Sequence, residues 1–311
     1  SFSGLRGKSL KDTLFVGVRL LKAFADCYKI LSSRKASAVL GMGGYVCFPG
    51  GVMSAARGLP LVMVNADAAM LLSNRALLPI TDVLACGFDG PAAQHKVSRV
   101  TGNPVRAEIE AIAEPAQRFA GRSGPLKVLV VGGSLGARAL NQVLPQALAQ
   151  IPVAQRPRIT HQTGMANLEA VKADYVKAGL DPARDVELLP FINNMAQRLV
   201  DCDLIVCRAG AITVSELCAA GVPSILIPLV VSTTAHQRDN AEFMAAHQAA
   251  IHLPQSELRA DTLAAQLQSL QRGELAAMAD RARALARHQS AAAVADAIEQ
   301  FVKPSTEKAS A

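Results

Sequence analysis

The sequence predicts an α/β protein made of two domains with parallel sheets. The chain has 311 residues, half of them apolar, and short apolar runs alternate with helical patterns at the spacing of βαβ units. No apolar run reaches the roughly 18 uncharged residues of a membrane-spanning helix, and the start lacks a signal-peptide pattern. We therefore expect the chain in the cytosol.

The first 35 residues are basic. They hold eight Lys and Arg against two Asp, so this segment carries +6 of the net charge of +7. Apolar residues repeat at helical spacing over residues 9–32. Two interpretations stay open: a helix packed on a sheet with a solvated basic edge, or a basic and apolar surface resting on anionic lipid. The residues expected at a lipid surface are Lys8, Lys11, Leu14, Phe15, Val18, Arg19 and Lys22.

The rest of the first domain reads as short strands over residues 37–40, 60–64, 82–86 and 98–101. Gly41, Gly43 and Gly44 follow the first of these strands, where glycine lets the backbone approach a ligand or another backbone closely. Asp67 lies just past the second, before a helix. Residues 107–125 are charged, Ala-rich and without a strand pattern, so we expect a linker there.

The second domain begins with a strand over residues 127–131, a glycine loop and a helix over 139–150. This resembles a dinucleotide fingerprint, which requires an acidic residue about 20 positions further on. No Asp or Glu occurs between Gly132 and Glu169, so a dinucleotide site is not expected. Further strands are predicted over 158–161 and 186–191, and helices over 236–249, 256–270, 274–288 and 291–301.

Residues 203–228 form the most informative βαβ pattern. A buried strand over 204–207 leads through a turn of small residues into a helix that opens near Thr213 and closes at Gly221, before a strand over 224–227. Such a turn presents free backbone N–H groups, whose natural partner is phosphate. Thr213 and Glu216 also fit a capping box, which is the alternative interpretation of that acidic residue.

The six cysteines show no Cys-x-x-Cys pair. We expect them to be reduced core residues rather than disulfides or a zinc site. Neither a metal nor a cofactor is expected.

Several stretches together, in one order along nearly the whole chain, resemble the MurG family of UDP-N-acetylglucosamine transferases. The matching stretches are Ser-Gly-Leu-Arg-Gly-Lys (3–8), Leu-Gly-Met-Gly-Gly-Tyr-Val (40–46), Gly-Asn-Pro-Val-Arg (102–106), Val-Gly-Gly-Ser-Leu-Gly-Ala-Arg (131–138), Phe-Ile-Asn-Asn-Met-Ala (191–196), Cys-Arg-Ala-Gly-Ala-Ile-Thr-Val-Ser-Glu (207–216) and His-Gln-Arg-Asp-Asn-Ala (236–241).

The resemblance implies a GT-B fold, two Rossmann-like domains facing across a cleft. It implies an acceptor and membrane-associated domain over residues 1–105 and a UDP-sugar domain over 106–290, with the last helix, 291–303, packing back on the first. It also implies a metal-independent, inverting transfer of N-acetylglucosamine from UDP-N-acetylglucosamine to the 4-hydroxyl of the muramyl residue of undecaprenyl-diphosphate-linked muramyl-pentapeptide, in peptidoglycan synthesis. The expected location is the cytoplasmic face of the plasma membrane. The expected partner there is an anionic lipid surface, and no nucleic acid is expected to bind.

The resemblance also implies roles for single residues. The backbone at Ile192 reads the uracil, and Met195 packs near it. The turn from Arg208 to Thr213, which includes Ala211 and Ile212, holds the diphosphate, and Glu216 takes both ribose hydroxyls. Arg106 and Ser134 match positions near the diphosphate, and His236, Gln237 and Asn240 match the sugar-binding segment. The glycine loop at Gly43, Gly44 and Tyr45 belongs to the acceptor side.

Two departures affect the expected chemistry. The family's Gly-Gly-Thr-Gly-Gly-His loop, whose histidine is a favoured base, has no counterpart, and the chain starts at Ser1 without Met, so we expect a missing N-terminal piece. Asp67 falls where the family has a sugar-binding asparagine. It is a candidate base or sugar ligand, or else a cap for the following helix. The catalytic base stays unassigned, and the alternatives are an inactive UDP-sugar-binding protein or a UDP-sugar epimerase.

Overall fold

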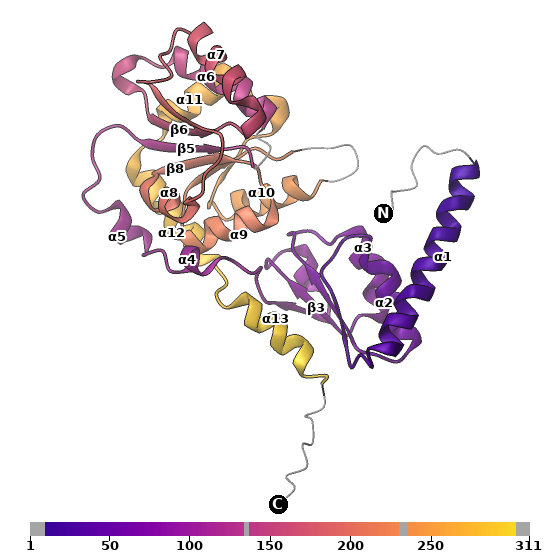
Figure 1. Ribbon diagram of the computed structural model, residues 1–311. Helices are drawn as coiled ribbons and strands as arrows, with labels where there is room; N and C mark the ends of the chain where they lie inside the picture. Colours follow the sequence, from indigo (N-terminus) through magenta and orange to yellow (C-terminus); the bar gives the residue numbers. More distant parts are fainter. Residues whose placement is uncertain (1–9, 134–136, 230–234, 303–311) are drawn as a thin grey trace, which may run out of the picture. The chain divides into compact units, whose positions relative to one another are not determined.

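The computed structural model describes residues 10–133, 137–229 and 235–302, with side chains from residue 19 onward. Its contacts divide the chain into two compact units (Figure 1). Unit 1 holds the described residues up to Asn103 and those from Gln289, and unit 2 spans Pro104–His288. Both units are α/β, with parallel sheets only among the described strands.

Unit 1 is built on a sheet whose described strands follow the order β1-β2-β3-β4. The strands are β1 (Val39–Gly41), β2 (Leu61–Asn65), β3 (Val83–Cys86) and β4 (Ser98–Val100). β2 and β3 are buried throughout, as expected for inner strands covered on both faces. β1 is only partly buried, although its apolar sequence suggests a buried strand.

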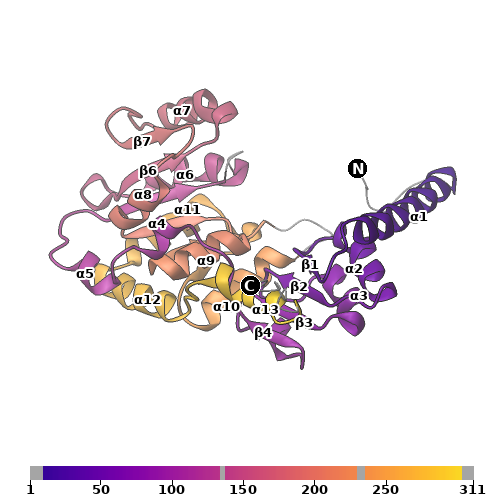
Figure 2. The same cartoon turned by 60° about the horizontal axis from the view of Figure 1, so that its bottom comes forward.

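Helices cover both faces of this sheet. Leu61 and Met63 point to the face under α2 (Cys47–Ala56) and α3 (Leu72–Leu77). Val62 and Val83 pack instead against Ala297 of α13 (Ser290–Glu299), which lies along β3 (Figure 2). Alternating side chains of one strand therefore supply two separate cores.

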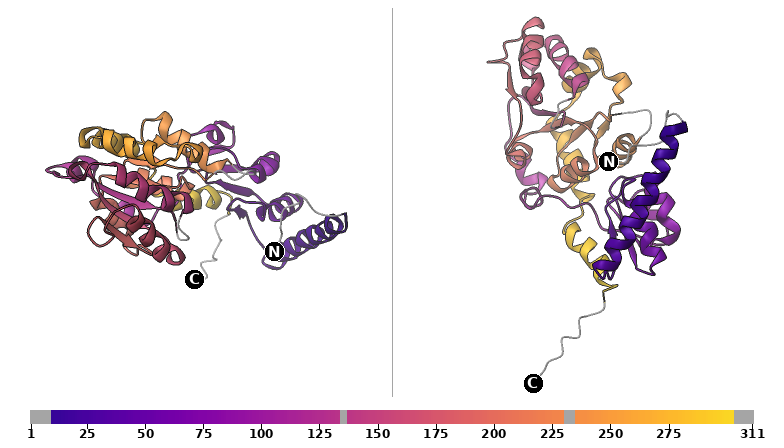
Figure 3. Two further views of the ribbon diagram at one scale, coloured as in Figure 1. Left: turned by 90° about the horizontal axis from the view of Figure 1, so that it is seen from above. Right: turned by 45° about the vertical axis from the view of Figure 1, so that its right-hand side comes forward.

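The first helix, α1 (Leu10–Ser33), packs along α2 (Figure 3). Phe24 of α1 meets Phe48 of α2 edge to face, with ring centroids 6.2 Å apart. Leu21, Tyr28 and Ile30 are 70%, 48% and 58% exposed in the described structure. The helix thus buries one side on its own unit and shows apolar side chains elsewhere.

Unit 2 has a larger sheet, with its described strands in the order β10-β9-β8-β5-β6-β7. The strands are β5 (Lys127–Val131), β6 (Arg158–Gln162), β7 (Val186–Leu189), β8 (Leu204–Cys207), β9 (Ser224–Leu226) and β10 (Ile251–His252). The chain builds β5, β6 and β7 outward in one direction and then returns to build β8, β9 and β10 in the other. The order therefore reverses between β5 and β8, where open α/β sheets bind ligands.

Helices flank both faces of the larger sheet (Figure 1). They are α4 (Ala107–Glu110), α5 (Pro115–Phe119), α6 (Arg138–Gln150), α7 (Leu168–Lys177), α8 (Met195–Asp201), α9 (Ala211–Ala220), α10 (His236–Ala246), α11 (Ala260–Ser269) and α12 (Arg272–Ala284). Short 3₁₀ turns lie at Leu78–Ile80, Pro91–Gln94, Val153–Gln155, Met165–Asn167 and Gln255–Glu257. Sequence reasoning missed α2, α7 and β10.

The segment over residues 107–125 is not a linker, so that prediction was wrong. It forms α4 and α5 and packs into unit 2 through two arginines. Arg118, 9% exposed, donates to the carbonyl of Ala220 at the end of α9, 2.7 Å away. Arg122 pairs with the buried carboxylate of Asp203 at 2.7 Å. Because these bonds reach residues 102 and 81 positions away in sequence, the local pattern gave no sign of them.

Candidate functional site

A cavity of about 640 Å³ opens at the carboxyl ends of β5 and β8, where the strand order reverses. It is lined by Gly132, Gly133, Ala137, Arg138, Ala139, Gln142, Arg208, Gly210, Thr213, Leu229, Gln237 and Gln255. The lining thus joins the glycine loop after β5, the turn before α9 and the start of α10. These segments lie far apart in the sequence, and the parallel sheet brings their ends to one edge.

The glycine turn after β5 leaves free space beside its backbone at this cavity. Gly133 has φ +84, a left-handed conformation that favours glycine, and a Cβ there would meet nothing within 4 Å. The side-chain amide of Gln162, at the end of β6, donates to the carbonyl of Gly133 at 3.2 Å. The backbone at this turn is therefore fixed by the neighbouring strand rather than by side chains in the cavity.

Two helices begin at the cavity, and neither has a side-chain cap among the described residues. The N-cap residues are Ala137 for α6 and Gly210 for α9, and neither helix has an acidic residue in its first turn. Their first N–H groups lack intrahelical acceptors, and each helix start carries about half a positive charge. This arrangement is suited to binding an anionic group.

Arg208 supplies a cation at the same place. Its guanidinium donates to the carbonyl of Ile227 at 3.1 Å, and burial lowers its pKa, although an arginine stays charged. The buried side chain of Asn240 donates to the carbonyl of Ala209 at 3.1 Å. The turn before α9 is thus held on one side by Ile227, the residue after β9, and on the other by α10, with Arg208 and Thr213 on its cavity side.

Glu216 lies one turn into α9 and pairs with Arg106. The guanidinium Nε–H donates to Oε1 of Glu216 at 2.8 Å, and this hydrogen bond raises the pKa of Arg106. Since α9 starts at Ala211 with Gly210 as its N-cap and no side-chain cap bond, the capping-box alternative for Thr213 and Glu216 is wrong. The carboxylate is held by another segment of unit 2 instead.

The other predicted residues of unit 2 gather near helix starts. Ala211, Ile212 and Thr213 are the first three residues of α9. His236 and Gln237 begin α10, and the side-chain oxygen of Gln237 accepts the N–H of Leu229 at 2.9 Å. Ile192 is buried before α8, and Met195 begins that helix. Of this set, Thr213 and Gln237 line the cavity.

The predicted acceptor-side residues belong to unit 1. Gly43 and Gly44 have φ +86 and +78, and Tyr45 beside them is 55% exposed. Asp67 is in the loop after β2, where the side-chain amide of Asn65 donates to its carbonyl at 2.7 Å. Helix α3 starts at Leu72, five positions further on and with Leu71 as its N-cap, so the capping alternative for Asp67 is wrong.

Some predicted positions cannot be placed in the same way. Lys8 and Ser134 lie outside the described residues, and the side chains of Lys11, Leu14, Phe15 and Val18 are also outside them. Arg19 and Lys22 are exposed on α1. No helix in the described ranges is long and apolar enough to span a bilayer. Among the same residues, no three His, Cys, Asp or Glu side chains gather as a metal site would require.

The structure also brings in residues that sequence reasoning did not assign. Arg138, Gln142, Leu229 and Gln255 all line the cavity. Gln255 follows β10, and its buried side-chain oxygen has no hydrogen-bond partner among the described residues. Arg138 directly follows the glycine loop in the sequence, so this motif could have identified it as a residue of the site. Gln255 could not be identified from the sequence, because β10 has only two residues and no clear pattern.

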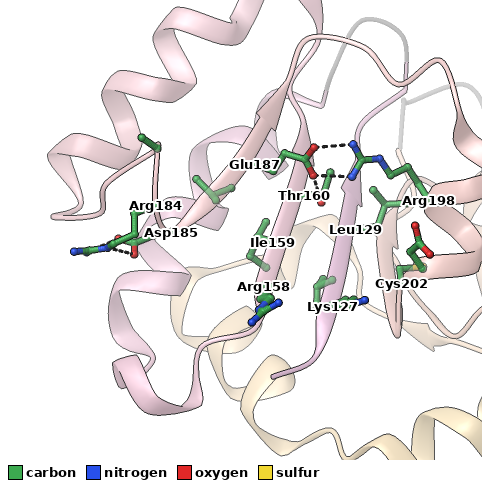
Figure 4. A pocket seen from close by; sticks show the side chains of 14 residues that line it. Lys127, Leu129, Arg158, Ile159, Thr160, Arg184, Asp185, Glu187, Arg198 and Cys202 are labelled. Atoms are coloured by element: carbon green, nitrogen blue, oxygen red, sulfur yellow. Dashed lines mark hydrogen bonds and ion pairs between the residues drawn. The ribbon is translucent and has the colours of Figure 1, made fainter. Parts of the chain in front are cut away.

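A larger cavity, about 810 Å³, lies at the opposite edge of the same sheet, around the first residues of β5, β6 and β7 (Figure 4). Its charged side chains mostly satisfy one another. Arg198 binds both oxygens of Glu187 at 2.7 Å, and Arg184 pairs with Asp185 at 2.9 Å. Since ligands of open α/β sheets bind at the carboxyl edge, size does not make this cavity the functional site.

A family model and two curated relatives are similar to this chain. Residues 127–301 match the glycosyltransferase family 28 C-terminal domain. A relative from Methylibium petroleiphilum is 62% identical and covers 97% of this chain and 82% of its own length. One from Chromobacterium violaceum is 61% identical, covering 97% and 83%. Both are named UDP-N-acetylglucosamine--N-acetylmuramyl-(pentapeptide) pyrophosphoryl-undecaprenol N-acetylglucosamine transferase.

Two solved structures are also similar to this chain. The crystal structure of Acinetobacter baumannii MurG matches with a TM-score of 0.81 at 32% identity, covering 96% of this chain and 84% of its own. A Staphylococcus aureus MnaA–UDP structure matches with a TM-score of 0.62 at 12% identity, covering 92% and 81%. The second likeness shows the fold alone. The predicted GT-B class, with its two parallel-sheet α/β units, is confirmed.

Proposed function

The chain belongs to the MurG family, the UDP-N-acetylglucosamine--N-acetylmuramyl-(pentapeptide) pyrophosphoryl-undecaprenol N-acetylglucosamine transferases, and on this premise we propose where its donor binds. The enzyme transfers N-acetylglucosamine from UDP-N-acetylglucosamine to the lipid-linked muramyl-pentapeptide. We place the diphosphate of the donor in the cavity between the glycine turn and the start of α9. The observation that carries this placement is the pair of uncapped helix starts, α6 and α9, at one cavity with Arg208.

The reaction explains these residue types. The acceptor 4-hydroxyl attacks C1 of the sugar, the bond from C1 to the diphosphate oxygen breaks, and UDP leaves as the hydroxyl proton passes to a base. Negative charge grows on the β-phosphate in the transition state. Fixed N–H donors and positive helix ends stabilise that charge at no cost of reorganisation. Arg138 and Arg208 supply full charges at the same place.

The remaining donor contacts follow the family resemblance. Glu216 accepts the two ribose hydroxyls, since a carboxylate offers several acceptor sites. The backbone at Ile192 and the side chain of Met195 belong to the uracil end, and His236 and Gln237 to the sugar. Asn240 acts through the turn that it holds, because its side chain is buried against Ala209.

Donor binding is tested by calorimetry with UDP-N-acetylglucosamine on Glu216→Ala. Each charge-assisted hydrogen bond lost should weaken binding by about 1.5–3 kcal/mol. Unchanged donor affinity in a folded variant would remove Glu216 from the ribose site. Release of UDP in the presence of a short-chain lipid acceptor tests transfer itself, and donor hydrolysis or epimerisation without transfer would contradict the proposed reaction.

We also propose that unit 1 meets the acceptor at the cytoplasmic surface of an anionic membrane. The glycine loop at Gly43 and Gly44 gives the acceptor a close backbone approach, and Asp67 is the candidate base or sugar ligand of that side. The support for the membrane contact is α1, where Arg19 and Lys22 are exposed beside Leu21, itself 70% exposed. Basic residues next to apolar ones are suited to lipid headgroups.

Flotation with anionic vesicles tests the membrane contact. Neutralising Lys8, Lys11, Arg19 and Lys22 should reduce vesicle binding by about 1 kcal/mol per charge, and high salt should release the wild-type protein. Neutralising the exposed Lys172 and Lys177 of α7 is the matched control. Equal loss per neutralised charge in the control set would mean that only net charge matters. A loss of donor affinity in the α1 variant would mean that the segment is structural.

A further inference from the structure

Arg106 and Glu216 come from two segments of unit 2 that pack together. Arg106 is the N-cap residue of α4, Glu216 lies in α9, and these two helices are in contact. The Nε–H of Arg106 donates to Oε1 of Glu216 at 2.8 Å. The Glu216 side chain is 16% exposed and that of Arg106 is 46% exposed. The carboxylate is therefore the more confined partner, and the guanidinium reaches it from the solvent side.

This bond leaves much of the Glu216 carboxylate free to accept hydroxyls. A carboxylate has two oxygens and about four acceptor sites, and Arg106 uses one oxygen at a single nitrogen. Among the described residues, no other side chain forms a hydrogen bond with Glu216. Oε2 and the remaining site on Oε1 thus stay available, in an orientation that the guanidinium fixes.

The guanidinium of Arg106 already has two carboxylates near it. Besides Glu216, Glu108 lies 3.8 Å from its terminal nitrogen. One positive and two negative side chains together carry a net negative charge, which is unfavourable for a diphosphate. Arg208 and Arg138, in contrast, line the cavity at the uncapped helix starts, and neither forms an ion pair with a side chain among the described residues.

We propose that Arg106 is a positioning residue for the donor's ribose: it orients the Glu216 carboxylate toward the two hydroxyls and does not bind the diphosphate. This inference rests on the proposed function in assigning Glu216 to the ribose. It differs from the resemblance, which places Arg106 near the diphosphate. The two roles predict opposite dependence on the two parts of the nucleotide.

The test measures dissociation constants of UDP and 2′,3′-dideoxy-UDP for wild type, Arg106→Gln, Glu216→Gln and the double variant. With a positioning role, Arg106→Gln weakens UDP about tenfold or more and leaves dideoxy-UDP nearly unchanged, because the latter has no hydroxyls for Glu216. The double variant then binds UDP no more weakly than Glu216→Gln alone, since the two residues act as one unit. Arg106→Lys keeps the charge but lacks the planar Nε–H fork, so it rescues UDP binding only in part.

A diphosphate role gives a different result and would overturn the proposal. Arg106→Gln would then weaken both nucleotides equally, Arg106→Lys would largely restore binding, and the double variant would show additive losses. Arg184→Gln is the matched control, because it removes another Nε–carboxylate pair of the same unit, 2.9 Å long, at the other edge of the sheet. It should leave both dissociation constants unchanged.

The same measurements separate this proposal from the proposed function. If Glu216→Gln binds UDP and dideoxy-UDP with the same ratio as wild type, the ribose assignment of Glu216 fails, and the inference about Arg106 fails with it. If Glu216→Gln loses the ratio but Arg106→Gln keeps it, the ribose assignment stands and only the positioning role is wrong. Circular dichroism and thermal unfolding of each variant establish that the compared proteins are folded.

Discussion

The two edges of the unit 2 sheet differ in whether their charged groups are paired. At the amino edge, in the larger cavity, arginines and carboxylates pair with one another, as Arg198 does with Glu187 (Figure 4). At the carboxyl edge, in the smaller cavity, Arg208 and two uncapped helix starts face the open space. Parallel strands aim helix starts toward the carboxyl edge, so unsatisfied N–H groups accumulate there.

The difference shows how to choose between cavities of one domain. By volume, 810 Å³ against 640 Å³, the cavity at the amino edge would be chosen as the ligand site. The unpaired positive groups favour the cavity at the carboxyl edge instead. Charged side chains that already pair with one another have few free sites for a ligand. Positive groups without a partner anion carry an unfavourable desolvation free energy unless an anion binds. Stability should therefore depend on the amino edge, and donor binding on the carboxyl edge.

The largest expected effect is on stability, from Asp203→Ala at the amino edge. Asp203 is 1% exposed and binds Arg122, Arg272 and the N–H of Lys127. Removing one partner of a buried ion pair costs about 3–5 kcal/mol of unfolding free energy. Urea denaturation measures this loss, and UDP affinity below the unfolding transition should not change. The exposed neighbour Asp201→Ala is the control, with an effect within about 0.5 kcal/mol.

The next effect is on binding, from Arg208→Gln at the carboxyl edge. We expect UDP to bind about 1.5–3 kcal/mol more weakly, while uridine, which has no phosphate, is nearly unaffected. Calorimetry with both ligands measures the difference. Arg158→Gln, an exposed cation at the larger cavity, should leave UDP binding intact. A loss in Arg158→Gln equal to that in Arg208→Gln would contradict the assignment of the diphosphate to the smaller cavity.

A smaller effect is expected on the pH dependence of the unfolding free energy, to which Asp203 contributes. Burial alone would raise the pKa of Asp203, but its hydrogen bonds from Arg272, Lys127 N–H and Arg122 hold the pKa below that of a free Asp. Its contribution is therefore complete above the unfolded pKa of about 4 and is lost as the pH falls through the folded pKa.

One proton changes the unfolding free energy by at most about 1.4 kcal/mol per pH unit. Urea midpoints between pH 6 and pH 3 should fall less steeply in Asp203→Ala than in wild type. Parallel curves for the two proteins would mean that Asp203 titrates normally in the folded state.

The smallest effect is expected from Glu187→Gln, which breaks the pair seen in the larger cavity. Glu187 is 44% exposed and Arg198 is 26% exposed, so solvent screens their attraction. We expect less than about 1 kcal/mol of lost stability and unchanged UDP affinity. Weaker UDP binding in this variant would show that the amino edge takes part in donor binding after all.

Much of the fold could be predicted from the sequence because its signals are local. The inner strands β2, β5 and β8 are continuous apolar runs, and the glycine at Gly221 ends α9 in a left-handed conformation. The turn before α9 was visible as small residues between a strand and a helix. What failed were segments without a period of their own: α2, rich in glycine, β10, with two residues, and residues 107–125, which Arg118 and Arg122 fix through distant carbonyls and a carboxylate.

By itself, the sequence determined the α/β class, most strands and the family, since periodicity and motifs depend only on neighbours along the chain. The tertiary structure decided which group Glu216 pairs with. Its spacing from Thr213 fits a cap, and only the packing of α4 on α9 shows that the carboxylate pairs with Arg106, 110 positions away. It also showed which cavity lies where the strand order reverses between β5 and β8, because this reversal is a property of the assembled sheet. Contacts between distant segments depend on how elements pack, and no local pattern encodes them.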